Sequence, residues 1–127
     1  MSKMLEDTNE NPRLNFCFSF SNYYVIIFDH DKTTQPHFHV VDWKTYGKKF
    51  NSKILINKAK YYKGETDKLN QRDITMLQYM LNCSYFNKNT MVKPQNLWEL
   101  LIATWNSKNK QKVRLNKEKP NYLFKLK

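Results

Sequence analysis

Glycine is scarce in this sequence of 127 residues, which contains only 2. Neither the G-x-x-x-x-G-K-[ST] nor the G-x-G-x-x-G pattern occurs, so the glycine-built phosphate loops of P-loop and dinucleotide-binding proteins are excluded. Cysteine is equally scarce, and Cys17 and Cys83 have no C-x-x-C spacing. We expect both to be reduced, buried thiols rather than parts of a disulfide or metal framework.

Long apolar runs are missing as well. The longest, over residues 23–28, is far too short to cross a bilayer. Residues 1–7 have no basic region followed by an apolar core, so they do not form a signal peptide. We therefore expect a soluble, cytoplasmic protein with no membrane contact, and nothing in the sequence predicts a cofactor.

Acidic residues are few relative to basic ones. The 11 Asp and Glu against 22 Lys and Arg give a formal net charge of +11. Such a charge suits a polyanion, because each neutralised phosphate releases condensed counterions. The expected partner is nucleic acid, RNA rather than DNA, or an acidic protein. The alternative is that the lysines are a solvated surface in a sequence rich in Asn and Lys.

Apolar residues make up 40% of the chain, which is enough for the core of one domain. We expect a flexible lead-in over residues 1–13, a single α+β domain over 14–109, and a basic tail over 110–127. Five segments have the alternating or continuous apolar pattern of β-strands: 14–20, 23–28, 37–41, 50–57 and 59–63. Of these, 23–28 is expected to be a central strand covered on both faces.

The first strand places Phe16, Phe18 and Phe20 on one face, and these side chains are expected in the core. This strand either forms a hairpin with the next one or joins it as a single long strand with a bulge. Residues 122–127 also alternate, so they could add an edge strand or dock on a partner.

Two segments have helical periodicity. Over residues 70–82 the apolar side chains recur at i, i+3 and i+7, with Asn70 as the N-cap. A second helix is expected to begin at Lys93–Pro94 and to end near 106–109, with Trp98 and Trp105 in the core. Strands followed by helices predict an α+β fold, a bent antiparallel sheet of four to five strands with two helices packed on one side.

The segment 35–41 contains the strongest candidates for a chemical role in the sequence. Its two histidines, His37 and His39, project to the same side of a strand. They could act as base and acid in a metal-independent ribonuclease, with lysines stabilising the phosphorane. They could also bind a metal ion if a third ligand came from residues 29–31 or Asp42. A structural role, with hydrogen bonds to carbonyl or carboxylate groups, is favoured over metal binding, and no metal site is predicted.

Basic and aromatic side chains follow the histidines. The candidate contacts to nucleic acid or a protein partner are Trp43, Lys44, Tyr46, Lys48, Lys49, Lys53, Lys110, Lys112 and Arg114. Residues 43–49 are expected to form an exposed turn whose aromatic rings could stack on unpaired bases. The basic tail could follow phosphates, which would make binding fall steeply with salt.

The motif Pro36–Val40, Pro-His-Phe-His-Val, is followed by a strand with a glycine after it, a Leu-Asn-Gln-Arg helix start and a leucine-rich helix ending in Trp-Asn. This order resembles a family of small bacterial proteins marked by Pro-Pro-His-Phe-His-Val, over roughly residues 22–106. Gln35 replaces the first proline of that motif, and residues 43–49 form a longer insertion. The resemblance implies a compact α+β domain and a role in a presumed toxin–antitoxin module, and supplies no established catalytic residue.

These observations predict an accessory protein of a toxin–antitoxin, defence or mobile-element system. It would bind its partner through residues 37–53 and the basic tail. The alternatives are the ribonuclease and a non-catalytic adaptor subunit. An enzyme requires a cleft that gathers His37, His39 and lysines, whereas an adaptor requires those histidines to be held in the fold and an exposed apolar or aromatic patch elsewhere.

Overall fold

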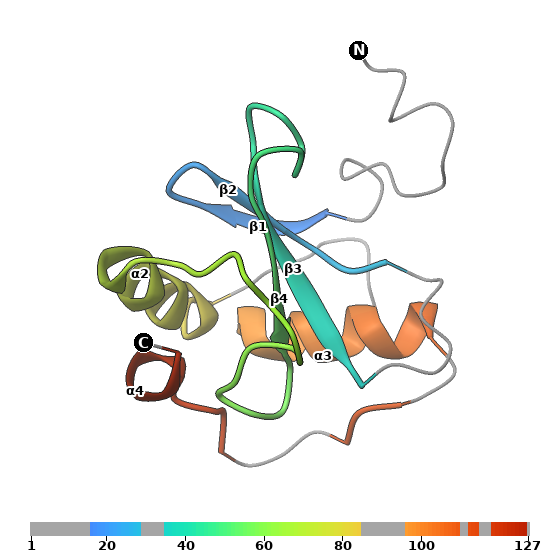
Figure 1. The fold of residues 1–127 in the computed structure, drawn as a ribbon. Helices are drawn as coiled ribbons and strands as arrows, with labels where there is room; N and C mark the ends of the chain where they lie inside the picture. The colour runs from blue at the N-terminus through green and yellow to red at the C-terminus, as the bar shows by residue number, and fades with distance from the viewer. Residues whose placement is uncertain (1–15, 29–34, 85–95, 110–111, 115–117, 127) are drawn as a thin grey trace.

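The computed structural model describes residues 16–28, 35–84, 96–109, 112–114 and 118–126. Its elements in chain order are β1 Phe16–Phe20, β2 Tyr23–Ile26, β3 His37–Asp42, β4 Asn51–Leu55, α2 Gln71–Leu81, α3 Leu97–Lys108 and α4 Tyr122–Lys125 (Figure 1). The strands pair in sequence order into one open, antiparallel, four-stranded sheet. The predicted α+β fold is therefore confirmed. No helix in the described part of the chain is long and apolar enough to cross a membrane.

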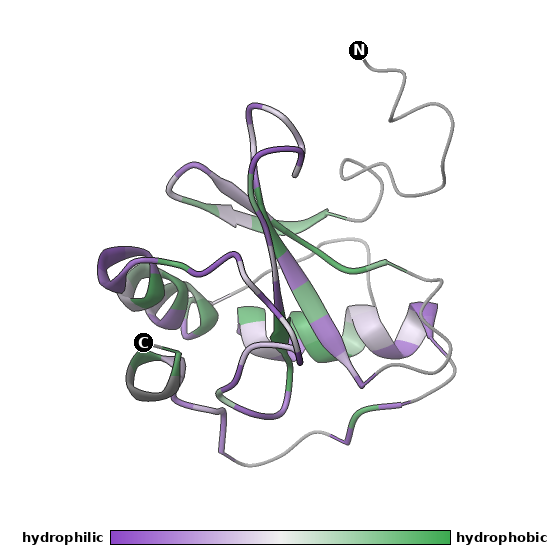
Figure 2. Cartoon of the chain, viewed as in Figure 1, coloured by the Kyte–Doolittle hydropathy of each residue, from purple (hydrophilic) through white to green (hydrophobic). Residues whose placement is uncertain are grey.

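One face of the sheet carries the main core. The side chains of Val25, Phe38, Val40 and Ile54 form a single buried cluster with apolar residues of α2 and α3. Trp98 and Trp105 belong to this cluster, as predicted. From His37 to Val40, polar and apolar residues alternate along β3 as expected, and Val41 interrupts the alternation (Figure 2). Both helices therefore cover the same side of the sheet.

The hairpin between β1 and β2 contains a bulge. Phe18 pairs with Val25, but Phe16 pairs with Ile26, so one extra residue, Cys17, is inserted between them. The insertion reverses the direction of Phe16, which lies on the face away from the helices and is 46% exposed. The prediction that Phe16 belongs to the core was wrong, while Phe18 and Phe20 are buried in it.

The sulfur of Cys17 lies on the helix side of the sheet. Its neighbour there is Thr104 of α3, and burial raises the pKa of the thiol to about 11. Neither Cys17 nor Cys83 forms a disulfide bond. Both residues are partly buried as a whole, and the sulfur of Cys17 itself is buried against α3 as predicted.

Helix α2 begins where its capping residue predicts. The Asn70 side-chain oxygen accepts a hydrogen bond of 2.8 Å from the backbone N–H of Asp73. The Asp73 carboxylate accepts a second bond of 3.0 Å from the hydroxyl of Tyr23 in β2. Burial and this carboxylate raise the pKa of Tyr23 to about 12. The first turn of α2 is thereby tied to the sheet.

Helix α3 ends at Lys108, as predicted, but it begins later than predicted. Its N-cap is Asn96, whose side chain accepts a bond of 2.9 Å from Glu99 N–H. The predicted start at Lys93–Pro94 lies outside the described residues. The local capping group, rather than the proline, sets the first turn.

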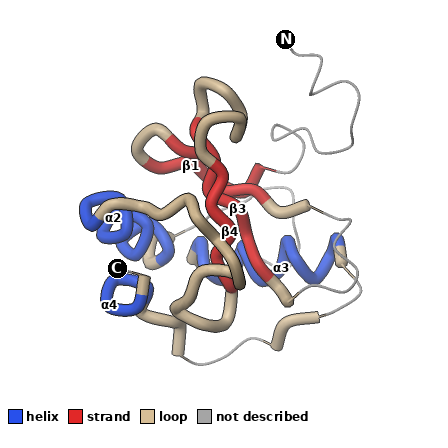
Figure 3. The backbone as a smooth tube through the Cα atoms, in the orientation of Figure 1, coloured by secondary structure: helices blue, strands red, loops and turns tan. Residues whose placement is uncertain are grey.

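Two predicted strands are absent from the described residues. Segment 59–63 contributes only one bridge, between Ile54 and Tyr61, because the chain bends over 56–60. Residues Tyr122–Lys125 form the short helix α4 beside α2 (Figure 3), not an edge strand. The spacing of Tyr122 and Leu126 is i, i+4, and both side chains are fully buried.

The outer edge of β4 is covered by the chain itself. Backbone N–H groups of Asn51 and Lys53 donate hydrogen bonds to the carboxylates of Asp67 (2.9 Å) and Glu65 (2.6 Å). The N–H of Tyr62 donates to the carbonyl of Lys53 at 2.9 Å. The donors that an edge strand normally leaves unpaired are thus occupied.

Candidate nucleic-acid interface

The second face of the sheet, which we term the aromatic face, lies opposite the helices except at His37, where Trp105 of α3 comes within 5.5 Å of the imidazole ring. Its side chains are Phe16, Tyr24, Ile26, His37, His39, Val41 and Lys53. The strand register aligns Tyr24 with Val41, and Ile26 with His39 and Lys53. Because alternate residues of a strand share a face, these side chains form continuous rows across the sheet.

The turn 43–49 is built around the carboxylate of Asp42. One oxygen accepts hydrogen bonds from the Thr45 N–H (2.9 Å) and hydroxyl (2.6 Å). The other accepts from the N–H groups of Gly47 (3.1 Å) and Phe50 (3.2 Å). Four donors on one carboxylate fix the path of the turn between β3 and β4.

This turn folds back over the aromatic face. Tyr46 and Gly47 both have left-handed backbone conformations, with φ of 53° and 93°. A Cβ atom at position 47 would lie only 3.2 Å from a methyl carbon of Val41, so glycine permits the close approach. Tyr46 then stacks on Tyr24, with ring centroids 6.0 Å apart and planes at 11°. Phe16 meets the same Tyr24 ring edge-on at 5.6 Å.

Aromatic and cationic groups at this turn are accessible to solvent. Trp43 is 43% exposed, and the exposed lysines are Lys44, Lys48, Lys49 and Lys53. The ammonium group of Lys53 lies 5.5 Å from the centre of the Tyr62 ring. The predicted residues between 43 and 49 therefore share one turn, whereas Lys53 lies on β4 beside Tyr62. Tyr46 is half-buried because it stacks against the sheet.

The two histidines are adjacent but buried. Their exposed fractions are 2% for His37 and 5% for His39, and their rings lie 5.0 Å apart. Nδ1 of His37 donates to the carbonyl of Gln35 at 2.8 Å. Nδ1 of His39 donates to the side-chain oxygen of Asn51 at 2.8 Å. A carbonyl oxygen can only accept, so these contacts require the proton on Nδ1.

Aromatic rings enclose both imidazoles. The ring of His37 lies 5.0 Å from Tyr62 and 5.5 Å from Trp105, and the ring of His39 lies 4.8 Å from Phe28. A catalytic acid or base must reach the proton that it transfers. Burial in this aromatic cage instead favours a structural role for the pair.

The described residues contain no group of three or more His, Cys, Asp or Glu side chains that could hold a metal ion. Asp42, one of the possible third ligands, is committed to the turn. The other candidates, residues 29–31, lie outside the described part of the chain.

The basic tail does not join the turn. Residues 112–114, drawn in orange-red, lie at the opposite end of the molecule from the turn 43–49 (Figure 1). Lys112 donates hydrogen bonds to the carbonyls of Asn106 and Asn109 at the end of α3, a favourable place for a cation. Arg114 is exposed, and Lys110 lies outside the described residues. The single surface predicted from 37–53 and the tail is therefore divided.

Replacing Asp42 with asparagine is expected to lower the free energy of unfolding by about 1–3 kcal/mol. The amide NH2 of asparagine takes the place of one carboxylate oxygen and cannot accept the hydrogen bonds that this oxygen receives. Burial acts to raise the pKa of Asp42, but the bonds from Thr45, Phe50 and Gly47 outweigh it and lower the pKa below 3.8. The stability due to this carboxylate is thus present above pH 3.8 and lost as the pH falls through the folded-state pKa.

Urea titrations of the wild type and D42N between neutral pH and pH about 3 would check both effects. The variant should be less stable at neutral pH and should lose less stability on acidification. E118Q, which changes an exposed carboxylate, is the matched control and should shift the unfolding free energy by less than about 0.5 kcal/mol. Equal effects of D42N and E118Q would contradict the role of Asp42.

Several residues of this surface were not predicted from the sequence. Tyr24 and Phe16 were expected to be interior, and Tyr62 was placed in a strand. The one available signal for Tyr24 was its position next to Tyr23, because neighbouring strand residues face opposite sides. Phe16 had no such signal, since the bulge at Cys17 changes its direction.

Comparison with protein-family models, with curated proteins and with solved structures finds no match to this chain. The family resemblance of Pro36–Val40 therefore stays a prediction.

Proposed function

We propose that this protein binds single-stranded RNA through the turn 43–49 and the adjoining aromatic face, without cleaving it. One observation carries the proposal: the turn folds onto the sheet so that exposed Trp43 and the stacked Tyr24–Tyr46 pair adjoin a group of exposed lysines. Proteins that bind single strands combine a cationic path for phosphates with aromatic rings on which bases stack.

Single strands fit this surface better than duplexes. Aromatic rings need the open face of a base, which a duplex hides in its stack and which RNA loops and ends expose. The net charge of +11 favours a polyanion over a neutral ligand. The cytoplasmic location predicted from the sequence is part of this proposal.

The burial of His37 and His39 supports binding without cleavage. Their imidazoles are 2% and 5% exposed, and each Nδ1 already has an acceptor in the fold. Hydrolysis by this pair would require the sheet to open around them, which would separate His39 from Asn51. We therefore propose the ribonuclease only as the alternative.

Binding of fluorescent single-stranded RNA, followed by anisotropy over a range of salt concentrations, tests the proposal. W43A is expected to weaken binding about 5- to 150-fold, because stacking on one base is worth about 1–3 kcal/mol. Replacing Lys44, Lys48 and Lys49 together with alanine should reduce the slope of log K against log salt, by about 0.7 for each phosphate that the variant no longer neutralises.

R72A is the matched control for charge. Arg72 is exposed on α2, a helix on the other side of the sheet, so its loss should leave affinity and salt slope close to the wild type. DNA of the same sequence is expected to bind more weakly than RNA. Failure of the wild type to bind RNA at low salt would reject the proposal, as would equal losses in R72A and the lysine variants.

Membership of a toxin–antitoxin, defence or mobile-element module is a second part of the proposal and rests on the resemblance of Pro36–Val40. Purification of the tagged protein from its host, with and without nuclease treatment, separates the remaining alternatives. Co-purifying RNA that is released by salt supports RNA binding. A stoichiometric acidic protein with no RNA would instead identify an adaptor subunit, and the positive charge would complement that partner.

A further inference from the structure

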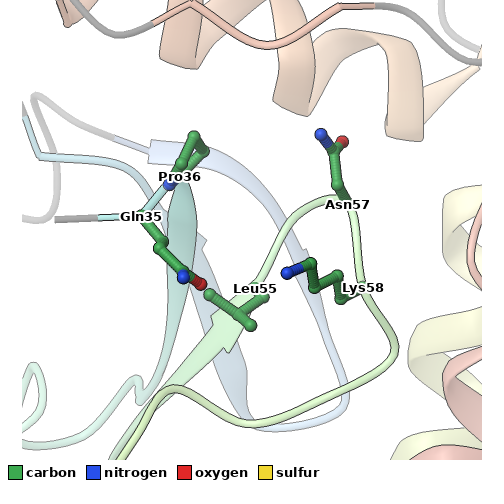
Figure 4. A pocket seen from close by; sticks show the side chains of 5 residues that line it. All are labelled: Gln35, Pro36, Leu55, Asn57 and Lys58. Atoms are coloured by element: carbon green, nitrogen blue, oxygen red, sulfur yellow. The ribbon is translucent and has the colours of Figure 1, made fainter.

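An open pocket of about 240 Å³ lies at the end of the β3–β4 ladder away from the turn 43–49. Gln35, Pro36, Leu55, Asn57 and Lys58 line it (Figure 4). We infer that this pocket holds one adenine base of the bound strand, a specificity subsite that rests on the proposed RNA binding.

The position of the pocket continues the proposed RNA surface. Leu55 is the cross-strand partner of His37, two residues along β4 from the exposed Lys53. From Asn51, beside the turn, to Leu55, the last residue of β4, the strand spans about 13 Å at about 3.3 Å per residue. That length accommodates about four nucleotides at a stacked spacing of about 3.4 Å, so a hexanucleotide is long enough to reach past both ends of the strand. One strand can therefore contact the turn, Lys53 and the pocket together.

The size of the pocket suits one ring system. Drug-sized ligands fill about 300–1,000 Å³, and this pocket of about 240 Å³ is smaller. Leu55, only 7% exposed, and Pro36 supply apolar surface for the flat face of a base. The amide of Gln35 and the ammonium of Lys58 point toward Leu55 from opposite sides (Figure 4).

The polar groups suit an adenine nucleotide. Carboxamides such as those of Gln35 and Asn57 present a donor and an acceptor side by side, the pattern that pairs with N7 and the amino group of adenine. An ammonium such as that of Lys58 suits the phosphate. Within the described part of the chain, none of these three side chains has a hydrogen-bond partner, so all three are available to a ligand.

The pocket is already formed without a ligand. Ile56 N–H donates to the carbonyl of Pro36 at 3.1 Å, and Leu55 N–H donates to the carbonyl of Lys60 at 3.0 Å. The hydroxyl of Tyr122 lies 2.5 Å from the carbonyl oxygen of Ile56. These bonds fix the backbone of both walls, so ordering on binding is confined to the exposed side chains of Gln35, Asn57 and Lys58.

Two measurements test the pocket. In NMR titrations of the full chain, AMP is expected to shift the side-chain amide signals of Gln35 and Asn57, and UMP, with the same phosphate, to shift them less. In anisotropy measurements, a uridine hexanucleotide with one adenine should bind more tightly than the all-uridine hexamer. Q35A and N57A should reduce that preference by about 5- to 150-fold in total, the value of one bidentate base contact.

K58A should weaken the binding of both hexanucleotides equally and leave the preference for adenine unchanged. K60A is its matched control, because Lys60 is an exposed lysine two residues further along the chain. RNA binding with no adenine preference, or with a preference that Q35A and N57A retain, would overturn the adenine pocket and leave RNA binding intact. Shifts by AMP in a protein that binds no RNA would reject the proposed function but support an adenine site. No response to AMP and no RNA binding would reject both.

Discussion

Replacing Tyr122 with alanine is expected to destabilise the fold by about 3–5 kcal/mol, the cost of removing a large, fully buried ring. The ring is 0% exposed and meets Phe38 of β3 edge-on at 6.0 Å. Its hydroxyl lies 3.0 Å from the carbonyl oxygen of Leu55 and 2.5 Å from that of Ile56. Domains of this kind are stable by only about 5–15 kcal/mol in total, so a large share would be lost.

Urea denaturation followed by circular dichroism measures this loss. Y122F keeps the ring and removes the hydroxyl, so it should cost only about 0.5–1.5 kcal/mol. Y79A is the matched control, because Tyr79 is a tyrosine of α2 that is 65% exposed, and its loss should cost less than about 0.5 kcal/mol. Equal midpoints for Y122A and Y79A would show that α4 is not part of the folded unit.

Alanine at His37 or His39 is expected to lower the free energy of unfolding by about 2–4 kcal/mol, in the range of large-to-small changes in a core. H37A removes a ring that contacts Tyr62, Trp105 and His39. H39A leaves the amide oxygen of Asn51 without its imidazole donor. If His37 and His39 have a structural role, both alanine variants are therefore expected to be less stable than the wild type.

H37F is the informative companion, because phenylalanine fills the aromatic cage but cannot donate to the carbonyl of Gln35. It should recover most of the stability that H37A loses and should still bind RNA. A catalytic pair gives the opposite pattern, in which alanine leaves the urea midpoint unchanged and abolishes RNA cleavage. That pattern would replace the structural assignment with the ribonuclease.

Features encoded by neighbouring residues could be predicted from the sequence. The start of α2 depends on Asn70 and the N–H group three residues later, and the end of α3 depends on its apolar stripe. The exposed turn 43–49 follows from its polar and basic composition. In each case the determining groups lie within a few positions of one another.

Features set by distant contacts could not be predicted. The bulge at Cys17 depends on how β1 aligns with β2, and the alternating pattern of residues 14–20 contains no sign of it. Residues 122–127 alternate like a strand, yet burial of Tyr122 and Leu126 beside α2 selects a helix. The cage around His37 requires Trp105, which comes from a helix far along the chain. The local sequence pattern therefore could not predict that the histidines are buried.

The two carboxylates that occupy the backbone donors of β4 also bear on assembly. In fibril growth or domain swapping, an incoming strand would pair with the edge of β4. It would first have to displace Glu65 and Asp67 and break the hydrogen bonds that their carboxylates accept from β4. Their negative charges would also repel another copy presenting the same edge. Concentrated solutions should thus resist polymerisation through this strand, and we expect any oligomer of the protein to form through a different surface.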